Sequence, residues 1–460
     1  MMVNKKKQKG GLYVIVVFLV YTFLIAHVDC NTITTWGYDL LDSIRIGHLS
    51  EFPVYTYQMH DMATNYNLFV NLITAVWLSP VYIIDNLCNA YAIMLVYDVW
   101  YKCLILLMTS LSVKLLGQIL EKLQIPRERI YEGQLYYSFS AILLISVLGK
   151  GQVDIISLCF LMFGIRNMLE EKYTLMALCY GLSLCVKPFS ILIIVPILIL
   201  LISKLEWKIV AYGFITHVPY MLDAIITRLC MPRYGEMKAI TSWQFKEAFG
   251  TSRVEQLFMA DYNDILIYWA IVLFVCLLCL KLAVTKRVKR VHYVILPAII
   301  YILFAFFVSA TAYWFVLLLP WLIIMGLEIS DRNDFRVLYF ITNIGLVIYT
   351  IMLERKHMPG ANYSLLQLVG IVGGSDVSIE PFAQWQIYGY KVGATMFVVG
   401  MLILWLTYIL EWKRGLLVEN KEIIDFKTRK SFTILCKILL PMPVILYFLV
   451  TYAIKIFYRG

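Results

Sequence analysis

The chain has 460 residues, of which 61% are hydrophobic and only 15% charged, with a formal net charge of +10. A soluble domain of this size needs a polar exterior that this composition cannot supply, and long apolar runs without a period of two exclude a β-barrel. The bases occur in short clusters between apolar runs, as the positive-inside rule expects, so we predict no nucleic-acid partner. The composition predicts an all-α polytopic membrane protein.

The first apolar run, residues 11 to 28, follows a cluster of lysines between residues 5 and 9. We therefore expect a cytoplasmic N-terminus and a retained first span that delivers Asp29 to the outside. The loop that follows, residues 29 to 91, is rich in acids in an otherwise acid-poor chain. This placement suggests carboxylate chemistry at the outer bilayer surface.

Residues 67 to 84 present the main choice of topology. If they crossed the membrane, Lys122 and the bases after it would lie outside; if they lie along the interface, every later basic cluster lies inside. We therefore predict interfacial helices in the first outer loop and about thirteen spans. The spans are expected near residues 11–28, 92–116, 132–149, 152–169, 173–186, 188–203, 207–226, 263–281, 293–311, 313–328, 336–353, 391–411 and 434–456.

Two units follow from this topology. Residues 1–330 form a catalytic transmembrane module that includes the first outer loop. Residues 331–460 form C-terminal transmembrane helices with an outer loop at 354–390, and a further outer loop lies at 227–262. We expect a multi-pass protein of the cell membrane.

The first outer loop contains a candidate pair of catalytic acids. Asp39 and Asp42 are three residues apart in WGYDLLDSIRIGHLSEF, so they share one face of an amphipathic helix. A carboxylate near an apolar surface can have its pKa raised toward a value useful to a general base. The alternative is a solvated interfacial helix whose acids have no catalytic role.

A second polar segment, GKGQVD at residues 149–154, interrupts two apolar runs. Gln152 and Asp154 are candidates for function because ionisable groups at membrane depth need partners. A glycine turn in which Asp154 caps the next helix is the alternative. Lys187, between two apolar runs and before a proline, could contact a lipid phosphate or extend to the interface.

The outer loop after residue 226 carries five bases against the positive-inside trend, which indicates either an anionic headgroup ligand or a merely solvated loop. These bases are Arg228, Arg233, Lys238, Lys246 and Arg253. Tyr313 and Trp314 begin a later span, where they serve either as interfacial anchors or as a platform for a sugar. The sequence contains no metal-binding motif.

The acidic first loop with interfacial helices, the GQVD element, the KPF element at 187–189 and the YWFVLLLPWLI span together resemble bacterial glycosyltransferases of the GT-C superfamily. The GQVD and KPF elements are similar to its mannosyltransferase-like branch. The thirteen-span layout with interfacial helices is similar to the lipid A aminoarabinose transferases and the protein mannosyltransferases. The likeness covers roughly residues 11 to 330.

The resemblance implies a polyprenyl-phosphate sugar as donor, a catalytic Asp in the first outer loop, and a supporting Asp at the junction of the third and fourth spans. The supporting acid maps onto Asp154. Many members carry the first acid about a dozen residues before the glycine that corresponds to Gly47, where this chain has Thr34 and Thr35, so the candidates are ranked Asp42, Asp39 and then Asp29.

The sequence thus predicts an inverting membrane glycosyltransferase, a hexosyltransferase that moves a sugar to a glycan, lipid or protein acceptor on the outer membrane face. Whether a divalent cation joins the phosphate is left open. The alternatives are a polysaccharide polymerase or ligase, which usually has a late outer loop rich in arginine and histidine, and a lipid-linked glycan transporter or flippase. A transporter should carry charges along the interiors of several spans.

Overall fold

The structure is a computed structural model that describes residues 2–25, 27–60, 64–88, 94–239, 261–262, 265–308, 312–353, 383–417 and 440–457. Within these residues the chain is helical apart from turns and one pair of two-residue antiparallel strands, β1 (Asp261–Tyr262) and β2 (Ile265–Leu266). The predicted all-α class is confirmed.

The helices follow one another along the chain in three groups. The first group is α1 (Met2–Phe23), α2 (Val28–Arg45), the 3₁₀ turn η1 (Leu49–Glu51), α3 (Phe52–His60), α4 (Leu68–Cys88) and α5 (Met94–Lys122). The second group is α6 (Arg127–Ser138), the π-helix η2 (Ile142–Gly149), α7 (Asp154–Leu169), α8 (Tyr173–Val186), the 3₁₀ turn η3 (Pro188–Ser190), α9 (Ile191–Leu205) and α10 (Lys208–Cys230). The third group is α13 (Ile267–Val284), α14 (His292–Phe307), the 3₁₀ turn η4 (Ala312–Leu318), α15 (Leu319–Glu328), α16 (Arg332–Leu353), α18 (Ala383–Lys413) and α20 (Met442–Phe457).

Seven helices in the described part of the chain are long and apolar enough to cross a membrane. Four further apolar segments are shorter, among them Gly11–Phe23 and Tyr173–Val186. Large hydrophobic side chains remain exposed along α10 and α13, for example Phe214 and Phe274 at 67% each, which suits a surface that faces lipid. The chain is a multi-pass membrane protein, and the count of thirteen spans stays a prediction.

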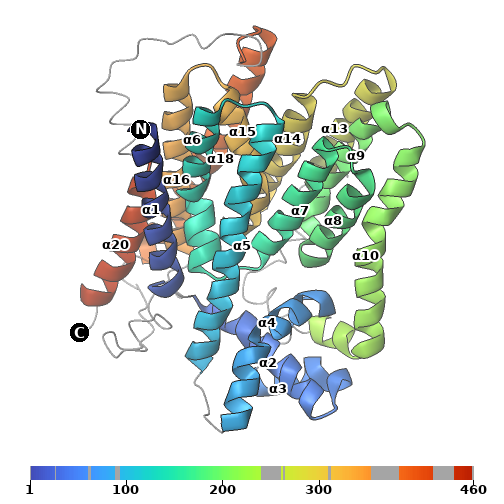
Figure 1. The fold of residues 1–460 in the computed structure, drawn as a ribbon, viewed down its shortest axis with the longest axis vertical. Helices are drawn as coiled ribbons and strands as arrows, with labels where there is room; N and C mark the ends of the chain where they lie inside the picture. Colours follow the sequence, from blue (N-terminus) through green and yellow to red (C-terminus); the bar gives the residue numbers. More distant parts are fainter. Residues whose placement is uncertain are drawn as a thin grey trace.

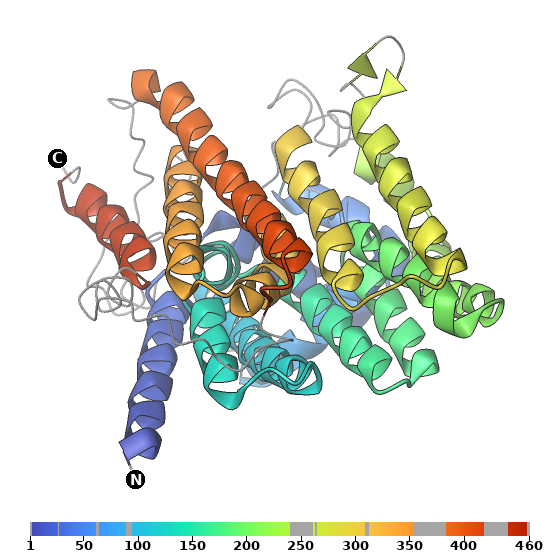
Figure 2. The same ribbon diagram turned by 90° about the horizontal axis from the view of Figure 1, so that it is seen from above.

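The helices form an upright bundle with a separate layer at its lower end (Figure 1). We call the ends upper and lower as they stand in that view. Helices α2, α3 and α4 form the lower layer, and the long helix α5 leads from this layer up through the bundle. Seen from above, α1 and α20 lie at one edge of the bundle and α10 and α13 at the other (Figure 2). Helix α4 is long enough to span a membrane and lies beside α2 in the lower layer. The interfacial position of residues 67–84 stays a prediction.

Polar contacts fix the lower layer to the bundle. The first backbone N–H groups of an α-helix have no partner within the helix. Those of Leu68 and Phe69 in α4 donate to Thr227 Oγ1 and Asp223 Oδ1 of α10, both at 2.9 Å. At the other end of α4, the Tyr97 hydroxyl of α5 donates to Asp85 at 2.9 Å. Helix α4 is therefore held at both ends.

Helices α16 and α18 approach each other through glycines. A Cβ at Gly345 would lie 2.6 Å from the Phe397 nitrogen, and one at Gly393 would lie 2.4 Å from the Tyr349 nitrogen. Membrane helices use such small residues because close backbone contact replaces the missing hydrophobic driving force.

Gly393→Ala is expected to lower the stability of the purified protein by about 1–3 kcal/mol, because the new methyl group forces two backbones apart. Gly213→Ala in α10 is the matched control, since nothing lies within 4 Å of its added Cβ. Thermal unfolding in detergent measures both variants. Equal midpoints for the two variants would contradict the close-contact interpretation.

Candidate functional site

The candidate site lies at the lower end of the bundle, where three segments of the chain meet. The first is the beginning of α2, whose N-cap residue His27 accepts a hydrogen bond from the Asp29 N–H at 3.1 Å. The second is the GKGQVD segment, and the third is the turn between α8 and η3. Each turn follows from local sequence: Lys187 precedes Pro188, which disfavours helix, and its backbone is extended at φ −141° and ψ 102°.

The GKGQVD segment needs glycine at residue 151. Gly151 has φ +67°, a left-handed conformation, and a Cβ there would lie 2.9 Å from Cys30 Sγ of α2. The Tyr101 hydroxyl of α5 donates to the Gly151 carbonyl at 2.9 Å. The π-helix η2 (Ile142–Gly149) leads into this turn, and π-helical segments are frequent at functional sites. The glycine allows the beginning of α2 to lie directly on the segment.

A buried lysine holds the same region together. The Lys102 ammonium, 2% exposed, donates to the backbone carbonyls of Tyr21 at 3.0 Å and Gly149 at 3.3 Å, and also to that of Ile25. Asp98, one turn earlier in α5, accepts from the Asn31 amide of α2 at 3.2 Å. Asp98 and Lys102 were not predicted, although charges inside the predicted span 92–116 were a usable signal.

Asp29, held by Gln152, is the solvent-accessible acid of the site. The Gln152 amide donates to Asp29 Oδ2 at 2.7 Å. Gln152 is buried, whereas the Asp29 side chain keeps 33% of its surface exposed. A carboxylate that is oriented by its neighbours and still partly open to solvent can accept a proton from a second molecule.

Asp154 and Lys187 form the buried part. The Lys187 ammonium lies 2.9 Å from Asp154 Oδ1, and the side chains are 7% and 0% exposed. Asp154 is the first residue of α7, where the helix dipole favours a negative charge. Asp29 lies near enough for its charge to act on Asp154. The structure thus brings together three predicted site residues, Gln152, Asp154 and Lys187, with Asp29.

Aromatic rings cover the lysine. The Lys187 ammonium lies 4.9 Å from the ring centroid of Trp314 and 5.5 Å from that of Tyr313. Lys150, only 1% exposed, lies 5.5 Å from the Tyr313 centroid. The predicted residues Tyr313 and Trp314 therefore lie at the site. Lys150 was not predicted, although it stands inside the GKGQVD segment.

The two acids ranked first from the sequence lie elsewhere in α2. Asp42 stands thirteen residues after Asp29, about 20 Å further along the helix axis. It contacts Arg45 at 2.7 Å, Tyr82 at 2.8 Å and Tyr55 at 3.3 Å. Asp39, 3% exposed, lies in the same half of the helix. The amphipathic helix is confirmed, but it is Asp29, ranked third, that reaches Gln152. The catalytic roles of Asp42 and Asp39 stay predictions.

Asp42 has a lowered pKa rather than the raised one expected of a base at an apolar surface. Partial burial would raise the pKa, but the hydrogen bonds from Arg45 and Tyr82 outweigh burial. These contacts favour the ionised form and tie α2 to α4.

Because the folded-state pKa of Asp42 is lowered, its contribution to stability is present above the unfolded pKa of about 3.9 and is lost as the pH falls through the folded value. We expect wild type to melt above Asp42→Asn at pH 6, and the difference to shrink as the pH falls below about 4. Thermal unfolding across pH measures this. Glu51→Gln, in the exposed turn η1, is the control. A pH-independent difference between wild type and Asp42→Asn would contradict the assignment.

The predicted basic loop is only partly described. Arg228 is exposed at the end of α10, and Arg233 pairs with Glu236 at 3.2 Å at the surface. Lys238 lies over the Tyr234 ring at 5.6 Å. Lys246 and Arg253 lie outside the described residues, as does the late outer loop from 354 to 382. The roles of these bases stay predictions.

Within the described ranges, no group of three or more His, Cys, Asp or Glu side chains is arranged to hold a metal ion. The site offers the carboxylates of Asp29 and Asp154, and Lys187 already pairs with Asp154. No protein-family model, curated protein or solved structure matches the chain. Its function is therefore inferred from the geometry of the site.

Proposed function

We propose that the chain is a membrane glycosyltransferase that moves a sugar from a polyprenyl-phosphate donor to a hydroxyl acceptor on the outer membrane face. One observation carries the proposal. A partly exposed carboxylate, Asp29, stands beside a buried Asp154–Lys187 pair under the Tyr313 and Trp314 rings, at one end of a bundle of apolar helices. A base, a cation and an aromatic platform are the groups that this transfer needs.

Asp29 is the general base in this proposal. Gln152 orients the carboxylate by donating to Asp29 Oδ2, and His27 Nδ1 lies 3.4 Å from Asp29 Oδ1. Because the side chain keeps 33% of its surface exposed, the acceptor hydroxyl can reach the carboxylate and pass its proton to it. The hydroxyl oxygen then attacks the anomeric carbon on the face opposite the phosphate. One C–O bond forms as the bond between the anomeric carbon and the phosphate oxygen breaks, so the configuration inverts.

The polyprenyl phosphate leaves with the electron pair of the broken bond, and its new negative charge needs a cation. Lys187 and Lys150 are the two ammonium groups beside the Tyr313 ring. A positive charge that is already in place in a site of low dielectric stabilises a leaving anion without reorganisation. Asp154 positions Lys187 in this proposal, because its carboxylate lies 2.9 Å from the Lys187 ammonium.

The arrangement favours an enzyme over a transporter. The carboxylates and lysines of the site gather at the lower end of the bundle, next to amphipathic α2, whereas a transport path needs polar groups through the bilayer. Lys102 and Asp98, which lie within α5, are engaged with backbone carbonyls and with Asn31 rather than in a path of their own.

The purified full-length protein is expected to transfer sugar from at least one member of a panel of polyprenyl-phosphate sugars. It should not use the matching nucleotide sugars, because the donor reaches the site from within the bilayer. Product release is followed by chromatography of labelled acceptor. Transfer from a nucleotide sugar without any polyprenyl lipid would contradict the donor class. Flux of a lipid-linked glycan across vesicles without transfer would favour the transporter.

A further inference from the structure

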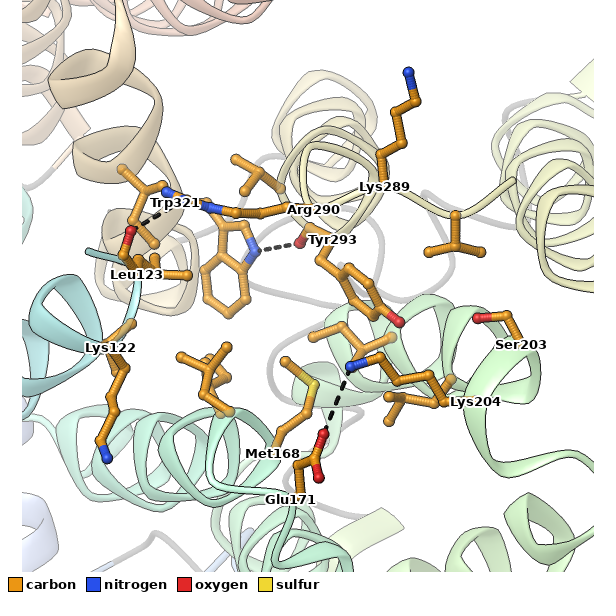
Figure 3. A pocket seen from close by; sticks show the side chains of 18 of the residues that line it. Lys122, Leu123, Met168, Glu171, Ser203, Lys204, Lys289, Arg290, Tyr293 and Trp321 are labelled. Atoms are coloured by element: carbon orange, nitrogen blue, oxygen red, sulfur yellow. Dashed lines mark hydrogen bonds and ion pairs between the residues drawn. The ribbon is translucent and has the colours of Figure 1, made fainter. Parts of the chain in front are cut away.

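A cavity of about 570 Å³ opens at the upper end of the bundle, the end opposite to the candidate site. Its walls come from α5, α7, α9, α14 and α15, and include Ile165, Ile197, Trp321 and Ile324. Figure 3 shows the cavity between these helices, with polar side chains around its edge. The cavity is of ligand size, and its apolar walls suit a hydrocarbon chain.

The edge of the cavity is basic. Five of its lining residues are cations, whereas Glu171 is its one acid. The cations are Lys122, Lys204, Lys286, Lys289 and Arg290. Lys122 and Lys289 stand on different sides of the cavity in Figure 3, and their side chains extend outward from its edge.

Among the described residues, two of these cations have no acidic partner. Lys122 pairs with Glu170 at 3.3 Å, Lys204 with Glu171 at 3.9 Å, and Arg290 with Glu328. Lys286 and Lys289 form no ion pair with any described residue. An anion at the opening would therefore meet two lysines whose charge is not neutralised by any acid in the described part of the chain.

Lys286 stands at a helix end that lines the cavity. Lys286 follows the end of α13 with φ +53°, a left-handed conformation that usually selects glycine at the end of a helix. Its N–H donates to the Ala283 carbonyl at 3.0 Å, as in a helix C-cap. A lysine at this position costs stability relative to glycine, and its side chain carries a charge to the opening of the cavity.

We propose that this cavity binds an anionic glycerophospholipid, with its phosphate at Lys286 and Lys289 and part of one acyl chain against Ile165 and Ile324. An apolar cavity with a basic opening at the end of a transmembrane bundle fits that chemistry, because the headgroup stays at the interface while the chain enters between helices. A soluble phosphate compound would leave the apolar walls unfilled. The proposal does not depend on glycosyl transfer.

Native mass spectrometry of the full-length protein, delipidated in detergent and titrated with lipid, tests the proposal. We expect phosphatidylglycerol to bind at least about tenfold more tightly than phosphatidylcholine with the same acyl chains. The double variant Lys286→Gln/Lys289→Gln should lose about tenfold in affinity for phosphatidylglycerol. Added inorganic phosphate should not displace the lipid.

The matched control is Arg287→Gln/Lys413→Gln, which removes two exposed bases from the same end of the bundle without altering the cavity lining. It should keep the affinity of wild type. An equal loss in both double variants, or equal binding of the two lipids, would overturn the proposal. Displacement by inorganic phosphate would point to a free anion and would overturn the lipid assignment.

A third variant tests the cavity rather than the charge. Val294→Phe places a larger side chain into the α14 wall. It should weaken the binding of both lipids while the charges remain. If Val294→Phe folds and binds phosphatidylglycerol as wild type does, the acyl chain does not enter the cavity and the proposal fails.

Discussion

Asp29→Asn is expected to reduce sugar transfer by about two to four orders of magnitude while the protein stays folded and binds its donor. The substitution keeps the size of the side chain and its ability to accept a hydrogen bond from Gln152, which lies 2.7 Å away. It removes the negative charge and with it the ability to take a proton from the acceptor. The measurements are the transfer rate and the apparent affinity for the donor.

Asp42→Asn provides the decisive comparison, because Asp42 belongs to the same helix but contacts Arg45 and Tyr82. We expect this variant to retain transfer at wild-type level or slightly below it. The reverse result, an inactive Asp42→Asn with an active Asp29→Asn, would restore the ranking drawn from sequence. Activity in both variants would remove a carboxylate base of α2 from the mechanism.

The sequence identified several residues of this site, but it did not show which of them contact one another. The period of the acids in the first outer loop showed that Asp39 and Asp42 share a helical face, and α2 confirms the helix. Periodicity does not show which end of a helix meets the bundle. That depends in part on Gly151, whose missing Cβ leaves room for Cys30, so the beginning of α2 rather than its middle lies at the site.

Residues far apart in the chain were identified singly but could not be paired. Lys187 and Asp154 were both candidates, yet their ion pair depends on how α7 and α8 pack. Lys102 was missed although it is a charge inside a predicted span, and its partners, which are backbone carbonyls, cannot be identified from the sequence. The basic clusters were interpreted only as markers of topology, and the cavity between them arises where five helices end.

The Asp154–Lys187 pair should be costly to break. Removing one partner of a buried ion pair leaves an uncompensated charge and typically costs about 3–5 kcal/mol. Lys187→Met and Asp154→Leu should each lower the unfolding midpoint sharply, because both side chains are almost fully buried. Both should also abolish transfer, because the Lys187 ammonium is either removed or no longer held in position. Such losses alone do not separate a structural role from a functional one.

The double variant Asp154→Leu/Lys187→Met makes that separation. Replacing a whole buried ion pair by apolar side chains of similar volume is often neutral or stabilising, so the unfolding midpoint should return close to that of wild type. Transfer should not return, because the leaving phosphate has then lost the ammonium that lies 4.9 Å from the Trp314 ring. Thermal unfolding and the transfer assay are measured on the same preparation. If the double variant regains both stability and transfer, the pair only holds α7 against the turn after α8. The cation for the leaving phosphate must then be sought at Lys150, the other ammonium beside Tyr313.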